Sequence, residues 1–204
     1  MADEYSVPFI CHDTLSTTCF LLGLITMNFE ETPTENSEDN CVTLSDELRD
    51  HVVALGAALR KKGWSVSCAE SCTGGGIAFA FTSVSGSSDW FKQSWVTYSN
   101  DAKHTSLNVK EATLMTHGAV SQETVAEMAT GAQDKSQANL VVTVSGIAGP
   151  GGGSSDKPVG TVWFGFICGE QRQEIKKVFS GGRDAVRAQA VRFAIAQLLT
   201  IMNV

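Results

Sequence analysis

Several familiar chemical signatures are missing from this sequence of 204 residues. Six cysteines are present, but none form a C-x-x-C pair, and no H-E-x-x-H occurs, so no zinc site is indicated. No G-x-x-x-x-G-K-[ST] phosphate loop and no complete G-x-G-x-x-G fingerprint occur. We therefore expect neither a metal nor a cofactor.

Basic surface and long apolar runs are also scarce. The net charge is −7 and no basic stripe is visible, which argues against DNA or RNA as a partner. The one apolar run near the start, residues 19–25, is too short to span a bilayer, and no Lys or Arg precedes it as in a signal peptide. With cysteines read as reduced thiols, these features predict a cytoplasmic protein that binds no membrane.

The composition indicates one ordinary domain with a tail, since 43% of the residues are hydrophobic and 18% are charged. Residues 1–43 are polar, weakly periodic and locally acidic, and we interpret them as a poorly ordered N-terminal tail. A further hypothesis is that Met27 is the true start, which mass spectrometry of the native N-terminus would test. Residues 44–204 form the predicted domain.

Hydrophobic periodicity predicts helices alternating with strands in that domain. Helices are expected at 44–62, 75–82, 110–117, 122–132 and 184–201, and strands at 65–69, 94–98, 139–144, 159–168 and 172–179. The last two strands form a hairpin through Gly169 and Glu170. The predicted fold is a three-layer α/β/α sandwich with a mixed β-sheet.

The junction at residues 69–75, Ala-Glu-Ser-Cys-Thr-Gly-Gly, is the most informative segment. A strand is expected to end there and a helix to begin, so backbone N–H groups of the helix start can face an anion or a developing oxyanion. Ser71 and Cys72 are two potential nucleophiles at that point. A nucleophile beside an anion-binding turn indicates a hydrolase.

A serine needs a base to remove its proton. Of the histidines, only His104 lies in an expected loop that can face the site, whereas its neighbour Lys103 acts as a base if burial lowers its pKa. Tyr98 lies close by in sequence and can orient the lysine. A second Ser-x-x-Lys spacing, Ser154 to Lys157, is discounted because flanking Gly and Pro residues oppose a helix there.

Two further segments offer ligand contacts. A Gly-rich loop runs from Ser145 and Gly146 through Gly149, directly after the expected central strand, where open α/β sheets bind ligands. Arg183 and Arg187 are four residues apart, so a helix presents both on one face, suited to phosphate or carboxylate. A mobile loop and surface ion pairs are the alternative interpretations.

Together and in this order, these segments resemble the CinA C-terminal domain family over roughly residues 44–199. The quoted blocks are Ala69–Gly75, Gly86–Ser88, Tyr98–Asn100 with Lys103, Gly118–Ser121, Ser145–Pro150 and Lys157–Val162. Enzymatic members are nicotinamide-nucleotide amidases, and this chain resembles their stand-alone form. The resemblance implies hydrolysis of nicotinamide mononucleotide to nicotinate mononucleotide and ammonia, a step in recycling pyridine nucleotides.

The resemblance also implies residue roles. Ser71 would be the nucleophile, Lys103 its base and Tyr98 a neighbour of both, while Thr73, Gly74 and Gly75 would contact the oxyanion or substrate. The loop from Ser145 through Gly146 and Gly149, with Arg183 and Arg187, would hold ribose and phosphate. One departure is Gly182, where the family usually has Asp, which puts the orientation of Arg183 in question.

Two alternatives stay open from the sequence. One is a nucleotide-binding regulatory module without catalysis, and the other is a hydrolase of a different small amide that uses the same residues. The expected partner is a small-molecule nucleotide substrate, or a small amide if the second alternative holds. The family resemblance also suggests a homodimer.

Overall fold

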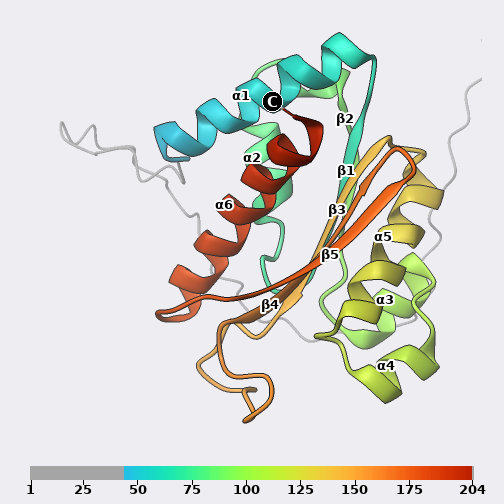
Figure 1. Cartoon of the computed structure of the whole chain (residues 1–204), viewed down its shortest axis with the longest axis vertical. Coiled ribbons are helices and arrows are strands. Elements are labelled where there is room, and N and C mark those ends of the chain that lie inside the picture. The colour runs from blue at the N-terminus through green and yellow to red at the C-terminus, as the bar shows by residue number, and fades with distance from the viewer. Residues whose placement is uncertain (1–43, 204) are drawn as a thin grey trace, which may run out of the picture. The chain divides into compact units, whose positions relative to one another are not determined.

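A computed structural model of the chain describes residues 44–203, and the predicted tail and the Met27 hypothesis lie outside this range. The described part is a five-stranded sheet of order β2-β1-β3-β4-β5. β1 runs parallel to β2 and β3, while β3, β4 and β5 are antiparallel. Helices cover both faces (Figure 1), with α1, α2 and α6 on one and α3, α4 and α5 on the other. The predicted three-layer sandwich with a mixed sheet is confirmed.

The strands are β1 (Val66–Glu70), β2 (Phe91–Val96), β3 (Leu140–Gly146), β4 (Thr161–Cys168) and β5 (Gln171–Val178). The helices are α1 (Asp46–Lys62), α2 (Gly76–Thr82), α3 (Asn100–Leu107), α4 (Glu111–His117), α5 (Gln122–Ser136) and α6 (Arg183–Met202), with a short 3₁₀ turn η1 (Ser87–Asp89). Most boundaries fall within a few residues of those expected from the sequence.

One helix was missed, and it matters for the site. The segment around Lys103 and His104 was treated as a loop, whereas the structure places both residues on α3. Ser99 caps this helix, since its hydroxyl accepts a hydrogen bond from the Ala102 N–H at 3.0 Å. The expected strand at 94–98 is also shifted, because β2 ends at Val96. The polar sequence of α3 hides its helical character, and the capping serine was the signal that could have revealed it.

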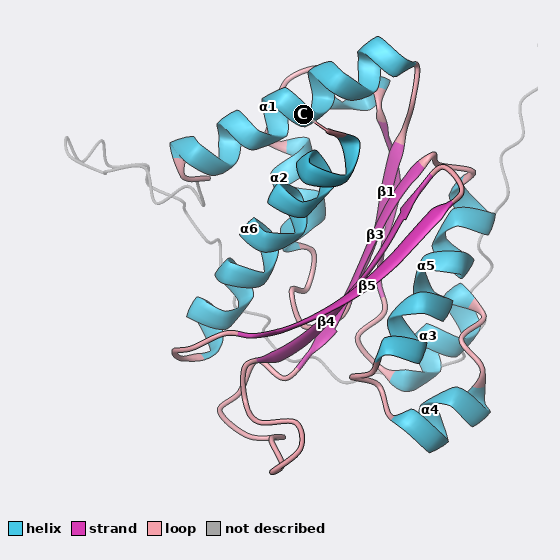
Figure 2. Ribbon diagram, in the orientation of Figure 1, coloured by secondary structure: helices cyan, strands magenta, loops and turns pink. Residues whose placement is uncertain are grey.

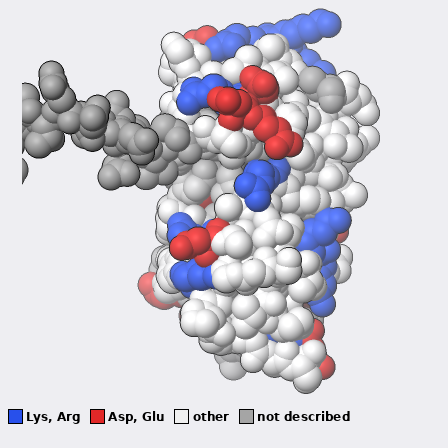
Figure 3. Space-filling model, turned by 90° about the vertical axis from the view of Figure 1, so that its left-hand side faces the viewer, with Lys and Arg blue, Asp and Glu red and all other residues white. Residues whose placement is uncertain are grey.

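Two hydrophobic cores hold the layers together, one on each face of the sheet. The larger core packs α1, α2 and α6 against the sheet, and the smaller one packs α3, α4 and α5. By length and composition α6 is apolar enough to cross a membrane, yet its buried residues belong to the larger core. The face shown in Figure 3 carries interspersed acidic and basic side chains rather than one broad basic surface.

The strand order determines where a ligand site can form. The chain leaves β1 for β2 on one side and later returns through β3 on the other side of β1. The connections that follow β1 and β2 pass over opposite faces of the sheet (Figure 2). A crevice therefore opens beyond the carboxyl ends of these parallel strands, the usual ligand position in open α/β sheets. Residues 71 and 97 directly follow β1 and β2 there, and Ser145 is the last residue but one of β3.

Candidate active site

The turn after β1 brings Ser71 to the carboxyl edge of the sheet. Its N–H donates to the Val144 carbonyl at 3.0 Å, which fixes the backbone of Ser71 beside β3. Gly74 and Gly75 then adopt φ values of 61° and 96°, a left-handed region that side chains disfavour. A Cβ on Gly76 would lie 2.8 Å from a Val191 methyl group of α6. The three glycines thus have structural reasons to be there, two for the turn and one for packing.

Lys103 reaches this turn from α3. Its Nζ lies 3.0 Å from Ser71 Oγ and donates a hydrogen bond to the Thr97 carbonyl at 2.8 Å. The lysine is 1% exposed and the serine 8%, so both side chains are buried. The contact that the sequence proposed between a serine and a lysine 32 positions apart is present in the structure.

Burial gives this lysine an unusual protonation equilibrium. Removing the ammonium from water disfavours its charged form and lowers the pKa of Lys103 to about 8. A useful fraction of the side chain is therefore a neutral amine near neutral pH. In that form the amine lone pair can accept the Ser71 proton while an N–H remains on the Thr97 carbonyl.

Cys72, the rival nucleophile, has the opposite electrostatic environment. Burial and, less strongly, the nearby Glu70 carboxylate raise the pKa of its thiol to about 12, although the backbone N–H of Cys72 itself, Lys103 and Arg187 act the other way. A cysteine attacks as the thiolate, and at neutral pH this thiol stays protonated. Ser71 is therefore the better candidate nucleophile of the two.

The N–H groups at the start of α2 have acceptors within the protein. Glu70 accepts from the N–H groups of Gly75, Ile77 and Ala78 at 2.9–3.1 Å. The Gly74 N–H donates to the Ser71 carbonyl, and the Gly76 N–H to the Thr73 carbonyl. The sequence suggested that the N–H groups of Gly74 and Gly75 bind an oxyanion. In the structure both groups are already hydrogen-bonded within the protein. Among residues 44–203, no other residue accepts a hydrogen bond from the Cys72 N–H.

The opposite wall of the site comes from the loop after β3 and the start of α6. Ser145 Oγ donates to the Ala119 carbonyl at 2.7 Å and so ties β3 to the α4–α5 loop. Arg183 donates to the Gly149 carbonyl at 2.9 Å and to the Tyr98 hydroxyl at 2.8 Å. The Gly-rich loop, α6 and the segment before α3 therefore meet at one guanidinium group.

These groups surround a cavity of about 210 Å³. Six of the predicted site residues line it, namely Ser71, Lys103, Tyr98, Ser145, Gly146 and Arg183. Cys72, the rival nucleophile, also lines it, and three further lining residues have no predicted role: Ala119, Val120 and Ala148. Of these, Ala119 and Val120 lie in the Gly118–Ser121 block, whose resemblance to the family was the available signal.

Thr73, Gly74, Gly75 and Arg187 lie around the turn rather than on the cavity wall, and Gly149 contributes its carbonyl to Arg183 from the loop after β3. The Thr73 hydroxyl donates to Glu70 at 2.6 Å, and its side chain is 1% exposed. Arg187 donates to the Thr73 carbonyl at 3.1 Å, behind the Ser71 turn. Thr73 and Arg187 instead line a separate groove of about 310 Å³ between α1, α2 and α6.

The structure also resolves the question that Gly182 raised. Gly182 is the residue before α6 and provides no side-chain cap, so an Asp there would cap the helix. Arg183 is nevertheless oriented, because Gly149 and Tyr98 accept its hydrogen bonds. The departure from the family pattern removes a helix cap and leaves Arg183 in place.

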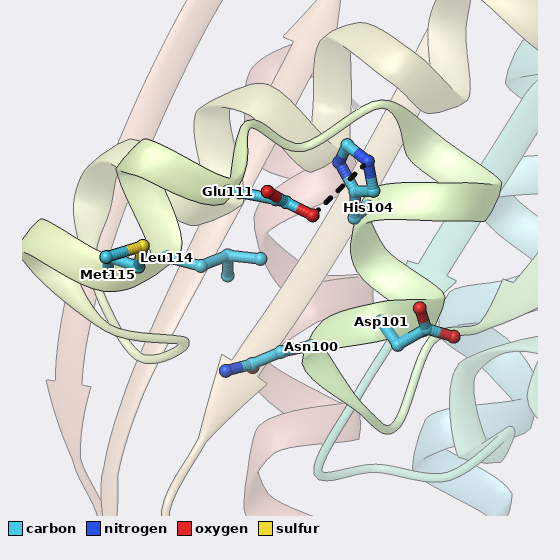
Figure 4. Close-up of a pocket in the computed structure, with 6 residues that line it drawn as sticks. All are labelled: Asn100, Asp101, His104, Glu111, Leu114 and Met115. Carbon is cyan, nitrogen blue, oxygen red and sulfur yellow. Dashed lines mark ion pairs between the residues drawn. The ribbon is translucent and has the colours of Figure 1, made fainter.

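The other candidate bases point elsewhere. His104 faces α4, where its Nε2 lies 3.9 Å from Glu111 in a hollow of about 400 Å³ (Figure 4). Lys157 donates to the His117 carbonyl at 2.8 Å, and residues 154–157 form no helix, as expected. Within residues 44–203, no three His, Cys, Asp or Glu side chains gather as a metal-binding group.

Comparison with known proteins places this chain in a family. The sequence model of the CinA C-terminal domain matches residues 48–202. The chain belongs to the CinA C-terminal domain family. A relative named nicotinamide-nucleotide amidohydrolase PncC, from Enterobacter agglomerans, is 55% identical over 153 residues, covering 74% of this chain and 93% of the relative. The protein of the same name from Escherichia coli K12 is 51% identical with the same coverage.

Solved structures agree with the fold. The competence/damage-inducible protein CihA from Agrobacterium tumefaciens superposes with a TM-score of 0.76 at 40% identity, covering 79% of this chain and 99% of that one. A CinA superfamily protein from Klebsiella pneumoniae gives a TM-score of 0.74 at 38% identity, with coverages of 76% and 98%. The match spans nearly the whole described domain.

Proposed function

We propose that this protein is a nicotinamide-nucleotide amidase, which converts nicotinamide mononucleotide to nicotinate mononucleotide and ammonia. The observation that carries the proposal is the buried contact of 3.0 Å between Lys103 Nζ and Ser71 Oγ at the wall of a cavity. The names of the relatives from Enterobacter agglomerans and Escherichia coli support the substrate.

The proposed reaction begins with proton transfer. The neutral Lys103 amine takes the Ser71 proton as Oγ attacks the carboxamide carbon of the substrate. The C–N bond then breaks, and the Lys103 ammonium returns its proton to the leaving nitrogen, which departs as ammonia. Water, deprotonated in turn by Lys103, attacks the acyl-enzyme, and Ser71 leaves with the proton restored. The product carboxylic acid loses its own proton to ammonia or solvent and leaves as the carboxylate, and the enzyme is regenerated.

The developing oxyanion needs a donor that no other residue of the resting protein occupies. Because Glu70 and nearby carbonyl groups occupy the N–H groups at the start of α2, we assign this role to the Cys72 N–H. Cys72 directly follows the nucleophile and lines the cavity. Its thiol then serves as part of the wall rather than as a reacting group.

The size of the cavity limits how the substrate enters. Pockets that enclose drug-sized ligands have volumes of about 300–1,000 Å³, and this one is smaller. The nicotinamide ring and its carboxamide fit inside, with the ribose and phosphate toward the rim at Arg183. Arg183 uses two of its donors on Gly149 and Tyr98, and the fork of five N–H groups leaves others for a phosphate. Arg183 is therefore the proposed phosphate contact.

A homodimer in the cytoplasm is part of the proposal. The sequence supports the location through its cysteines, interpreted as reduced thiols. Sedimentation of the purified full chain would test the assembly, since a single species at monomer mass would contradict it.

The test of the function is ammonia release from nicotinamide mononucleotide by the purified full chain, with and without EDTA, beside Ser71→Ala. We expect release by the wild-type protein in both conditions and a loss of about 10³-fold or more in the variant. Near-wild-type release by Ser71→Ala contradicts the mechanism. Nucleotide binding without release would favour the regulatory module, and release from other small amides alone would favour the second alternative.

A further inference from the structure

A buried carboxylate that takes no part in the proposed chemistry lies directly beneath the nucleophile. Glu70, the last residue of β1, is fully buried, and Ser71 follows it in the chain. The mechanism uses Ser71, Lys103 and the Cys72 N–H and does not require this acid. Glu70 is also absent from the cavity wall.

Five donors converge on the two oxygens of Glu70. Oε2 accepts from the Thr73 hydroxyl at 2.6 Å and from the N–H groups of Gly75 and Ile77 at 3.0 and 3.1 Å. Oε1 accepts from the Ala78 N–H at 2.9 Å and faces the Cys68 thiol at 3.7 Å. All five partners are donors, and a carboxylate offers only acceptors, so the two sets match. The charge also lies at the N-terminal end of α2, where the helix dipole favours it.

These contacts enclose the turn that carries the nucleophile. The carboxylate holds the turn at Thr73 and the helix at Gly75, Ile77 and Ala78, and it is itself held in β1. On the other side, the Glu70 carbonyl accepts from the Thr97 N–H at 2.8 Å, and the Thr97 carbonyl receives Lys103 Nζ at 2.8 Å. One residue therefore connects both partners of the Ser71–Lys103 contact.

We infer that Glu70 is a positioning residue for catalysis, which holds the turn of residues 71–73 so that Ser71 Oγ faces Lys103 and the Cys72 N–H stays free for the oxyanion. By taking the N–H groups at the start of α2, the carboxylate also directs substrate anions away from that helix. The inference rests on the proposed amidase function where ammonia release is the measurement. The positioning role itself is argued from the hydrogen bonds of the turn alone.

Glu70→Gln is the first test, because the amide keeps the size of the side chain but turns one acceptor into a donor that faces N–H groups. We expect kcat for ammonia release to fall by about 10- to 100-fold through misplacement of Ser71. KM should stay within about twofold of wild type, since Glu70 does not line the cavity. A folded variant with wild-type kcat overturns the inference.

Thr73 supplies a matched pair in case Glu70→Gln does not fold. Thr73→Val removes the hydroxyl that donates to Glu70 while keeping the shape, and Thr73→Ser keeps the hydroxyl. We expect kcat to fall in Thr73→Val and to be restored in Thr73→Ser. Equal kcat values for the two variants contradict the inference, because a packing defect alone would affect the smaller serine as well.

A substrate-independent measurement separates this inference from the proposed function. The rate at which a fluorophosphonate labels Ser71 reports the reactivity of the nucleophile without any nucleotide. If wild-type protein is labelled but releases no ammonia from nicotinamide mononucleotide, the substrate assignment fails. The labelling rates of wild type and Glu70→Gln can still be compared in that case. Labelling of Ser71 at the wild-type rate in Glu70→Gln overturns the positioning role.

Discussion

Lys103 and His104 are neighbours on α3, yet they face different surroundings. The lysine is 1% exposed, and its amine meets Ser71 and the Thr97 carbonyl in the cavity. The histidine side chain is 46% exposed and lies beside Glu111, whose side chain is 76% exposed, in the hollow between α3 and α4 (Figure 4). Of the two, histidine is the side chain that usually serves as a base near neutral pH.

In the proposed mechanism, burial rather than residue type selects the base. Desolvation lowers the pKa of Lys103 to about 8, so a lysine acquires the protonation behaviour that catalysis needs. His104 has its Nδ1 near the Val109 carbonyl at 2.8 Å and its ring directed away from Ser71. Its place in the sequence suggested a base, but the helix turns it away from the nucleophile.

The largest expected effect comes from Lys103→Met, which keeps a long apolar side chain and removes the amine. We expect ammonia release to fall by about 10²- to 10⁴-fold, the usual contribution of a positioned general base. Measured kcat/KM, with circular dichroism as the check on folding, tests this. Retention of a tenth or more of the activity would mean that another group takes the Ser71 proton.

The pH dependence of the wild-type reaction is the next test. The lysine acts as a base only when neutral, and its pKa is lowered to about 8. Activity should therefore rise by about tenfold per pH unit below that value and level off above it. A profile of kcat/KM from pH 6 to pH 10 checks this, and a flat profile over that range would contradict a lysine base.

A smaller effect is expected at the rim of the cavity. Tyr98→Phe removes the hydroxyl that accepts a hydrogen bond from Arg183 at 2.8 Å. Tyr98 is 60% exposed, so the loss should be about 0.5–1.5 kcal/mol, or about 2- to 10-fold, and should appear mainly in KM. If kcat falls instead while KM holds, Tyr98 contacts the reacting atoms rather than the phosphate end.

The smallest effect is expected at His104 itself. His104→Gln keeps a polar side chain facing α4 and leaves Lys103 and Ser71 untouched, so kcat/KM should remain within about twofold of wild type. The same assay measures it beside Lys103→Met. A loss comparable to that of the lysine variant would remove the contrast between the two neighbours.

The sequence predicted the layers, the mixed sheet and the Ser71–Lys103 pairing, because these depend on hydrophobic periodicity and on short motifs. It did not predict α3, whose residues between Asn100 and Leu107 are mainly polar, or the direction in which His104 points. In a helix, adjacent side chains are rotated by about 100° from each other, which explains why Lys103 and His104 point in different directions.

The role of Glu70 also escaped the sequence. A glutamate directly after the strand expected at residues 65–69 looks like an ordinary polar position, and only the fold brings it under the start of α2. The cavity lining at Ala119 depends likewise on a hydrogen bond from Ser145 across 26 positions. Contacts between distant segments decide both, and hydrophobic periodicity does not carry that information, although both residues lie in blocks that resemble the family.

The most direct test of the account is the pH dependence of Ser71 labelling by a fluorophosphonate in the wild-type full chain, with the label mapped by mass spectrometry. The account predicts modification at Ser71, with a rate that rises through a single midpoint near the lowered pKa of Lys103, about 8, and with no such rise in Lys103→Met. Labelling at another residue, or a rate at Ser71 independent of pH, would contradict the buried lysine as the base that activates this serine.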